Sequence, residues 1–261
     1  NLSLTSQAKQ GNFTASTITS GLSLNPFLDL PMAVDVAQGK VNLSGSISPL
    51  LKGSFSQLQA TANLGLLVDR QPLAVNGQLN RGQLQATART NGLNLSPLLP
   101  NLTVPVSLAR SQVNISASLE QLQQKDLITV LNSLTGSGDI QLLVDNNLVK
   151  TKTLVNRGKV QAIAKSRSFS LNQFLPNLSF PVEALDTEVN LGGTTTDIFN
   201  LIAQKTPNLS GFTVTANSQL AMAQGRVKVR ANLSNNDWQS QVNVTSLNPE
   251  ILLQQKSGLS P

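Results

Sequence analysis

The sequence NRGQLQATARTNGLNLSPLLPNLTVPV (residues 80–106) returns as NRGKVQAIAKSRSFSLNQFLPNLSFPV (residues 156–182). A related stretch begins at Gln10, and the start of a further one is found at Asn235. Each copy has a glycine or asparagine at the same place, which we call the anchor position: Gly11, Gly82, Gly158 and Asn236. Self-similarity at a long period indicates a repeat architecture in which neighbouring units stack on one another.

The anchor glycines lie 71 and 76 residues apart, which divides the chain into three full units with a fragment on each side. We therefore expect residues 1–10 to end a preceding repeat, residues 11–81, 82–157 and 158–235 to form three repeats, and residues 236–261 to begin the next. All of them are expected to stack in one continuous β-structure. The chain opens without Met and within a strand-like pattern, so we expect it to be a piece of a longer protein.

Each unit opens with strict alternation of apolar and polar residues, as in the segment from Leu84 to Arg89, which predicts a half-buried strand. A Pro-containing segment follows and is expected to cross between strands. A second alternating strand comes next, and the unit closes with a hairpin. Its two-residue turn is predicted at Asn146–Asn147 in the second unit and at Gln224–Gly225 in the third. This pattern predicts about four strands per unit.

One or two short helices are expected between the second strand and the hairpin. Asp126 is a candidate N-cap for a helix whose apolar stripe includes Leu131 and Leu134. A second candidate covers residues 196–204, with Ile198, Phe199 and Ile202 on one stripe. The corresponding segment of the first unit, SPLLKG at residues 48–53, is too short for more than a turn.

Composition narrows the function classes. The 19 basic and 13 acidic residues give a formal charge of +6, but they are scattered, and aromatic residues make up only 3% of the chain. Nucleic-acid binding is not expected, because that function usually needs clustered basic residues beside stacking aromatics. Cysteine and histidine are absent from the sequence, which excludes disulfides, thiolate zinc sites and imidazole bases. No apolar run reaches the length of a membrane-spanning helix.

The predicted fold is all-β: an elongated, mostly antiparallel, curved sheet shaped like a half-pipe or taco, with an aliphatic interior groove. Two helices of about nine residues would each span only about 14 Å and cannot cover such a sheet, so the sheet must curl or form a sandwich. The aliphatic lining favours a trough over an aromatic-rich sandwich core. A parallel β-helix is the main alternative, and the hairpin turns count against it.

A trough of this kind would accept acyl chains, since each buried methylene contributes about 0.8 kcal/mol. The predicted groove lining comprises Val41, Leu43, Leu84, Ala86, Ala88, Val113, Ile115, Ala117, Leu119, Val160, Ala162, Ala164, Val189, Leu191, Val214, Val227, Val229, Ala231, Leu233, Val242 and Val244. No cofactor, metal or catalytic residue is predicted. Glu183 is expected on the opposite face from Asp186 and Glu188, which argues against a carboxylate site.

The GQLQATA and GKVQAIA strands, the LPNLTVPV and LPNLSFPV segments and the QVNISASL and EVNLGG strands resemble the β-repeat region of the TamB family, within the AsmA-like superfamily of bridge-like lipid-transfer proteins. The asparagine- and glutamine-rich surface is similar to that of members from photosynthetic bacteria and chloroplasts. The resemblance implies a periplasmic, inner-membrane-anchored protein with a hydrophobic groove for phospholipids, working with an outer-membrane barrel insertase. It also implies that the anchor and the docking ends lie outside this segment.

Three other functions stay open. The chain could be a chaperone or scaffold for assembling outer-membrane β-barrel proteins, using open sheet edges to pair with client strands. It could be a structural β-repeat stalk that supplies length alone. The apolar positions could also form the closed core of an ordinary soluble β-protein. An enzyme is not expected, because the sequence has no histidine, cysteine or glycine-rich phosphate loop.

Overall fold

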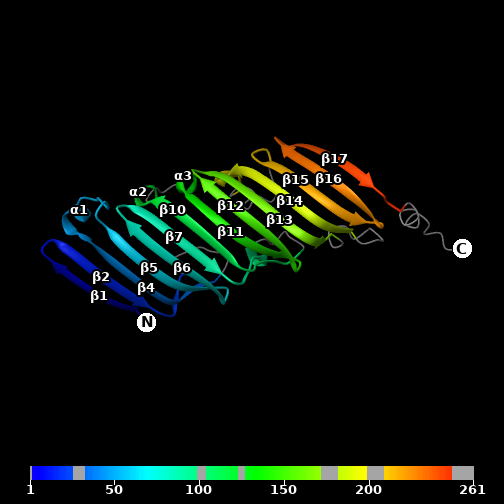
Figure 1. The fold of residues 1–261 in the computed structure, drawn as a ribbon. Coiled ribbons are helices and arrows are strands. Elements are labelled where there is room, and N and C mark those ends of the chain that lie inside the picture. The colour runs from blue at the N-terminus through cyan, green and yellow to red at the C-terminus, as the bar shows by residue number, and fades with distance from the viewer. Residues whose placement is uncertain are drawn as a thin grey trace.

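A computed structural model of the chain describes residues 2–25, 33–98, 104–122, 127–171, 182–198 and 209–248. All strands of these residues belong to one sheet, in which paired strands are antiparallel and most of them follow one another in the sequence (Figure 1). The first strand (Leu2–Lys9) and the last strand (Asp237–Thr245) lie at opposite ends of the long axis of the sheet (Figure 1). The predicted all-β, antiparallel, curved and open sheet is confirmed.

The strands are β1 (Leu2–Lys9), β2 (Asn12–Thr19), β3 (Leu22–Ser23), β4 (Val34–Ser46), β5 (Gln59–Val68), β6 (Gln71–Asn80), β7 (Gln83–Thr90), β8 (Leu93–Asn94), β9 (Val106–Leu108), β10 (Ser111–Ser118), β11 (Thr135–Val144), β12 (Asn147–Asn156), β13 (Lys159–Ser170), β14 (Val182–Thr194), β15 (Thr213–Met222), β16 (Gly225–Ser234) and β17 (Asp237–Thr245). Residues 11–81 contain β2 to β6, residues 82–157 contain β7 to β12, and residues 158–235 contain β13 to β16.

The strands on either side of the Pro-containing segments are antiparallel neighbours. Each follows a strand and precedes its antiparallel neighbour, since β7 pairs with β10 and β13 pairs with β14. The expected crossings are therefore long hairpin connections.

Two-residue turns hold the register of the sheet. Seven of them join described strands, and both central residues of each have positive φ, as at Arg81 (φ 50) and Gly82 (φ 74). Two successive positive φ values define a type I′ turn, whose twist matches the right-handed twist of the flanking strands. The predicted hairpin turns are one residue too late, because the turns lie at Asp145–Asn146 and Ala223–Gln224. Non-glycine residues occupy the left-handed region there.

The anchor positions repeat one backbone contact. The carbonyls of Gly11, Gly82 and Gly158 accept hydrogen bonds from the backbone N–H groups of Ile47, Leu119 and Thr195, at 2.8, 2.7 and 2.8 Å. Each donor is the first residue after β4, β10 or β14. The contact therefore joins the start of the first strand of a unit to the end of the second.

A second repeated feature is a break near the other end of these strands. The register shifts between Val36 and Gln38 in β4 and between Ala184 and Asp186 in β14, and β9 and β10 are separated at residues 109–110. Bulges bend strands and increase their twist. Beyond the breaks, Val34, Val106 and Val182 are buried, so the sheet packs most tightly past this line.

The helices lie along the opposite edge of the sheet, next to the anchor turns (Figure 1). They are α1 (Ile47–Leu51), α2 (Leu119–Leu122) and α3 (Leu127–Ser133). Three short helices thus replace the expected one or two, because the first unit also forms one in SPLLKG and because α2 was not anticipated. Residues 195–198 are helical, whereas Phe199 and Ile202 of the second candidate, and the proposed N-cap Asp126, lie outside the described residues.

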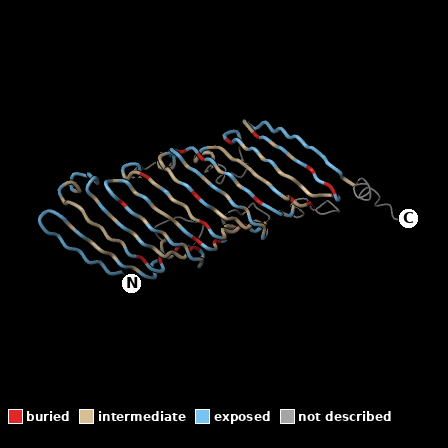
Figure 2. Tube along the Cα trace, in the orientation of Figure 1, coloured by how far each residue is buried: buried red, intermediate tan, exposed pale blue. Residues whose placement is uncertain are grey.

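The main hydrophobic cluster lies beyond the bulges of the first two units. Val34, Val68 and Leu93 form its buried centre, and they come from β4, β5 and β8. The half-buried residues around them are Leu24, Leu66, Leu73, Leu95 and Leu108. This packing curls the strand ends of two units onto one another, and most of each strand elsewhere is half-buried or exposed (Figure 2).

At the second anchor, Gly82, glycine is expected to matter through its backbone conformation alone. A Cβ added at Gly82 would meet no atom within 4 Å, but the φ of +74° is unfavourable for an L residue. Gly82→Ala should therefore lower the free energy of unfolding by about 1–2 kcal/mol. Gly92→Ala is the matched control, because Gly92 also has open space and lacks a positive φ. Urea denaturation of both variants checks this, and equal midpoints would contradict it.

Candidate functional site

The candidate site is one face of the sheet. Strand registers place all the predicted groove residues on it except Leu119, because apolar residues pair with apolar residues from strand to strand. Ala88 pairs with Val113, for example, and Leu191 pairs with both Ala162 and Val214. The same register continues to the last strand, where Val242 and Val244 pair with Val229 and Val227. We call this surface the apolar face.

Leu119 is the exception. It is the first residue of α2 rather than part of a strand, and its N–H is the one bonded to Gly82. The alternation of β10 ends at Ser118 because the chain turns into a helix there. Leu119 is therefore a residue of the sheet edge, and it does not line the face as a strand residue.

Sequence reasoning left four strands, β5, β6, β11 and β12, out of the predicted lining of the apolar face. Their side chains share the face by register with Val41, Ala88 and Val160. The missed residues are Ala60, Ala62, Leu64, Leu66, Val75, Leu79, Ile140, Leu142, Val149 and Val155. The signal was present as alternation in β5, β6, β11 and β12. This alternation predicts hairpins, and the same alternation also places apolar side chains of these strands in the groove lining.

Burial of the apolar face is greatest near the strand ends. Val34 and Val182 begin their strands and are 8% and 2% exposed, and Leu233 near the end of β16 is 8% exposed. In the middle of the sheet Ile115 is 42% exposed, and Leu191 is half-buried. No second layer of described residues covers this midline. The face is therefore a trough with closed margins and an accessible floor.

The trough deepens in the third unit. A recess of about 240 Å³ opens on the apolar face around Ser166, Thr187 and Ser218. The remaining lining is apolar: Val149, Ala164, Phe169, Leu171, Ala184 and Val189. The Thr187 and Ser218 hydroxyl oxygens are hydrogen-bonded to each other at 2.7 Å.

The opposite face is polar, and it holds a larger furrow of about 900 Å³ across β12 to β16. Its charged groups are five cations, Lys150, Lys165, Arg167, Lys228 and Arg230, and two carboxylates, Asp186 and Glu188. An acyl chain placed there would desolvate charged groups, which is unfavourable. The furrow is suited to water and anions, so the two faces differ in the ligands they can accept.

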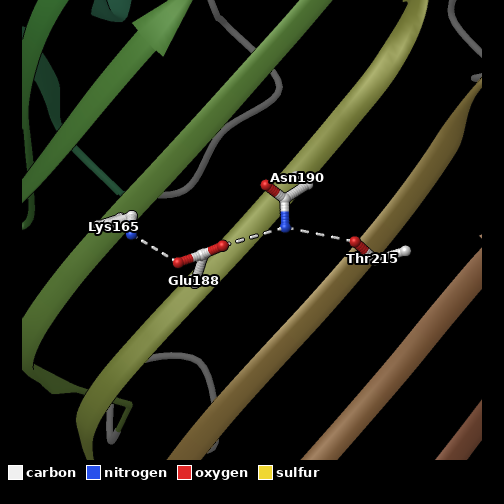
Figure 3. A network of polar contacts seen from close by, with 4 residues as sticks. All are labelled: Lys165, Glu188, Asn190 and Thr215. Carbon is white, nitrogen blue, oxygen red and sulfur yellow. Dashed lines mark hydrogen bonds and ion pairs between the residues drawn. The ribbon is translucent and has the colours of Figure 1, made fainter.

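A network of polar contacts extends from two lining residues of this furrow, Lys165 and Glu188, to Asn190 and Thr215 (Figure 3). Lys165 Nζ lies 2.6 Å from Glu188 Oε2, and Asn190 Nδ2 donates to Glu188 Oε1 at 3.3 Å and to Thr215 Oγ1 at 3.4 Å. The hydrogen bond from Lys165, followed by that from Asn190 and the charge of Lys165, lowers the pKa of Glu188 below its ordinary value of 4.5. Lys165 also stands opposite Lys150, an unfavourable like-charge pair that Glu188 offsets.

Glu183, Asp186 and Glu188 all lie on the polar face, contrary to prediction. Simple alternation separates Glu183 from the other two, but the bulge between Ala184 and Asp186 inserts one residue and restores Glu183 to their side. Among the described residues, no three potential metal-ligating side chains gather in one place. The carboxylates on this face therefore belong to a solvated charged surface.

Comparison with known proteins gave no match among family models, curated proteins or solved structures. Of the helices in the described part of the chain, none has the length and hydropathy needed to cross a membrane.

The Lys165–Glu188 ion pair predicts how the stability of the fold depends on pH. Because the pKa of Glu188 is lowered in the folded state, its contact with Lys165 stabilises the fold above pH 4.5 and is lost as the pH falls through the folded-state pKa. The effect on stability should be small, since both side chains are exposed. Lys165→Gln should raise the pKa of Glu188, as followed by carboxyl ¹³C NMR, whereas Lys150→Gln should change it less. An unchanged titration in Lys165→Gln would contradict this assignment.

Proposed function

We propose that the trough binds acyl chains of phospholipids, and that this chain is a segment of an elongated conduit that carries lipids between the inner and outer membranes. The observation that carries the proposal is a continuous apolar face whose midline has no covering layer of described residues. Monomeric soluble proteins rarely expose a contiguous apolar surface of this extent, and those that do usually use it for binding.

The chemistry of the lining fits this ligand class. The face consists mainly of valine, leucine, isoleucine and alanine, which offer contact to methylenes without demanding hydrogen bonds. Each buried methylene would contribute about 0.8 kcal/mol, so even half of an acyl chain supplies substantial affinity. The lining continues from strand to strand without a charged residue among the predicted groove positions, so a bound chain could be displaced along the trough at little cost.

The cellular setting is part of the same proposal and rests on the resemblance of the repeats to the TamB family. In that setting the protein lies in the periplasm or an equivalent intermembrane space, is anchored in the inner membrane, and meets an outer-membrane barrel insertase. Both contacts would use regions outside this segment. No enzymatic activity is proposed.

Pairing with client strands is the second candidate, and it would need a strand edge that the protein leaves open. Among the described strands, β1 pairs only with β2, and β17 pairs only with β16. Trp238 and Val242 of β17 are 62% and 56% exposed. An exposed edge beside apolar side chains can accept an added strand. Binding of an extended outer-membrane peptide that protects β17 amides from exchange would support this function.

The first test of lipid binding is occupancy. Gently purified protein should retain phospholipid that native mass spectrometry and solvent extraction detect, and emptied protein should take up a fluorescent fatty acid. A chain that holds no lipid and takes up no acyl probe would exclude the conduit and leave the structural stalk.

The second test is a pair of charged substitutions in one strand. Ile115 lies on the apolar face and Ser116 on the polar face of β10, so Ile115→Asp and Ser116→Asp introduce the same charge on opposite sides. Ile115→Asp should weaken acyl-probe binding about tenfold or more, because excluding two methylenes removes about 1.6 kcal/mol. Ser116→Asp should leave binding unchanged. Circular dichroism should match wild type in both, and unfolding of Ile115→Asp alone would indicate a closed core instead.

A further inference from the structure

The recess in the third unit comes from one position at which the units differ. Ser166 lies eight residues after its anchor, as Thr19 and Thr90 do, and Thr187 corresponds to Gly39 and Ser111. The third member of the row, Ser218, lies five residues before its two-residue turn, where the other units have Leu64 and Ile140. Only the third unit therefore has a small hydroxyl side chain at this place.

The first unit shows what the larger side chain does. A Cβ built at Gly39 would lie 3.0 Å from both Leu64 Cδ2 and Thr19 Cγ2, so Leu64 fills the space over this row. In the third unit Ser218 leaves that space empty, and the recess of about 240 Å³ lies there. The recess is thus a cavity at a place that Leu64 fills in the first unit.

The hydroxyls of the recess have hydrogen-bonding capacity to spare. A hydroxyl donates one hydrogen bond and accepts two, so the mutual bond between Thr187 and Ser218 uses one of their two protons. Ser166 is only 8% exposed, and its hydroxyl bonds to no other described residue. The Ser166 hydroxyl therefore lines the recess with its proton available, and a ligand acceptor there could accept it.

We propose that this recess binds the ester carbonyl of an acylglycerol lipid, with Ser166 and the Thr187–Ser218 pair as hydrogen-bond donors. The inference rests on the proposed function and deepens it, since it names the part of the lipid that one position of the trough recognises. A carbonyl oxygen is an acceptor with two lone pairs and carries no charge. It therefore suits a site that offers hydroxyl donors and aliphatic walls but no cation.

The dimensions of the trough agree with this placement. From Ser166 to Lys159, at the start of β13, the strand runs seven residues, or about 23 Å at about 3.3 Å per residue. Half of a membrane's hydrocarbon core is about 15 Å thick. With its carbonyl in the recess, an acyl chain can lie across the trough over Ala164, Ala162 and Val160 and end before the anchor turn.

The test compares two lipids that differ only in the carbonyl. A diacyl phosphocholine and the dialkyl ether phosphocholine of the same chain length are each used to displace a fluorescent fatty acid from the full chain. The ester lipid should bind about two- to tenfold more tightly, the range expected for one neutral hydrogen bond.

Three variants locate the effect. Ser166→Ala and Ser218→Ala should each reduce the preference for the ester lipid while keeping affinity for the ether lipid. Ser218→Ile, which copies the side chain of the second unit at Ile140, should fill the recess and abolish the preference. Ser240→Ala is the control, because it removes a hydroxyl from the same face in β17, away from the recess.

The outcomes separate the two proposals. If neither lipid displaces the probe from wild type, the proposed lipid-binding function fails. If both lipids bind wild type equally, or if the alanine variants keep the preference, the trough binds acyl chains without recognising the ester and this inference is wrong. The wild-type comparison decides even if Ser218→Ile does not fold.

Discussion

Strand register is the constraint on which the rest of this molecule depends. Side chains alternate between faces with a period of two, so a slip of one residue would move every apolar side chain of a strand to the polar face. Fourteen antiparallel passes, counting each broken strand once, must therefore keep the same phase along the described sheet. The type I′ turns and the repeated contacts of the anchor carbonyls maintain that phase. Because no layer of described residues covers the middle of the sheet, backbone hydrogen bonds carry an unusual share of the stability of the described fold.

The bulges reconcile this strict alternation with curvature. A regular sheet of this width would twist without folding its margin over the apolar face. An extra residue in the second strand of each unit bends that strand, and the residues beyond it are among the most buried in the chain. The same insertions shift the phase locally, which explains why Glu183 joins Asp186 and Glu188 on the polar face. Curvature and side-chain placement thus have one common cause.

The repeat made the architecture predictable, because three versions of each strand report the same alternation and the same turn places. Reading one version alone would not separate a half-buried strand of a trough from a strand of a sandwich. The predictions that were wrong concern features that depend on contacts between distant residues or on left-handed backbone conformations. The turn lies at Asp145–Asn146, with an aspartate at positive φ, whereas the sequence pattern favoured the two adjacent asparagines. The helix α2 begins at Leu119, although the alternation of apolar and polar residues in the sequence continues through that residue. The recess could not be predicted, because it depends on a small side chain at Ser218 where the other units have Leu64 and Ile140.

The repeated contact between an anchor carbonyl and the residue after the second strand also determines how such a molecule can change length. Counting each broken strand once, each unit contributes four antiparallel passes, an even number. The next unit therefore begins in the same direction, with its apolar side chains on the same side and its helical edge on the same margin. At about 4.8 Å per strand, one unit adds about 19 Å to the trough. Gain or loss of a whole unit would change the reach of the protein in steps of that size and leave both joints intact. Insertion of a single strand would reverse the direction of every strand that follows it.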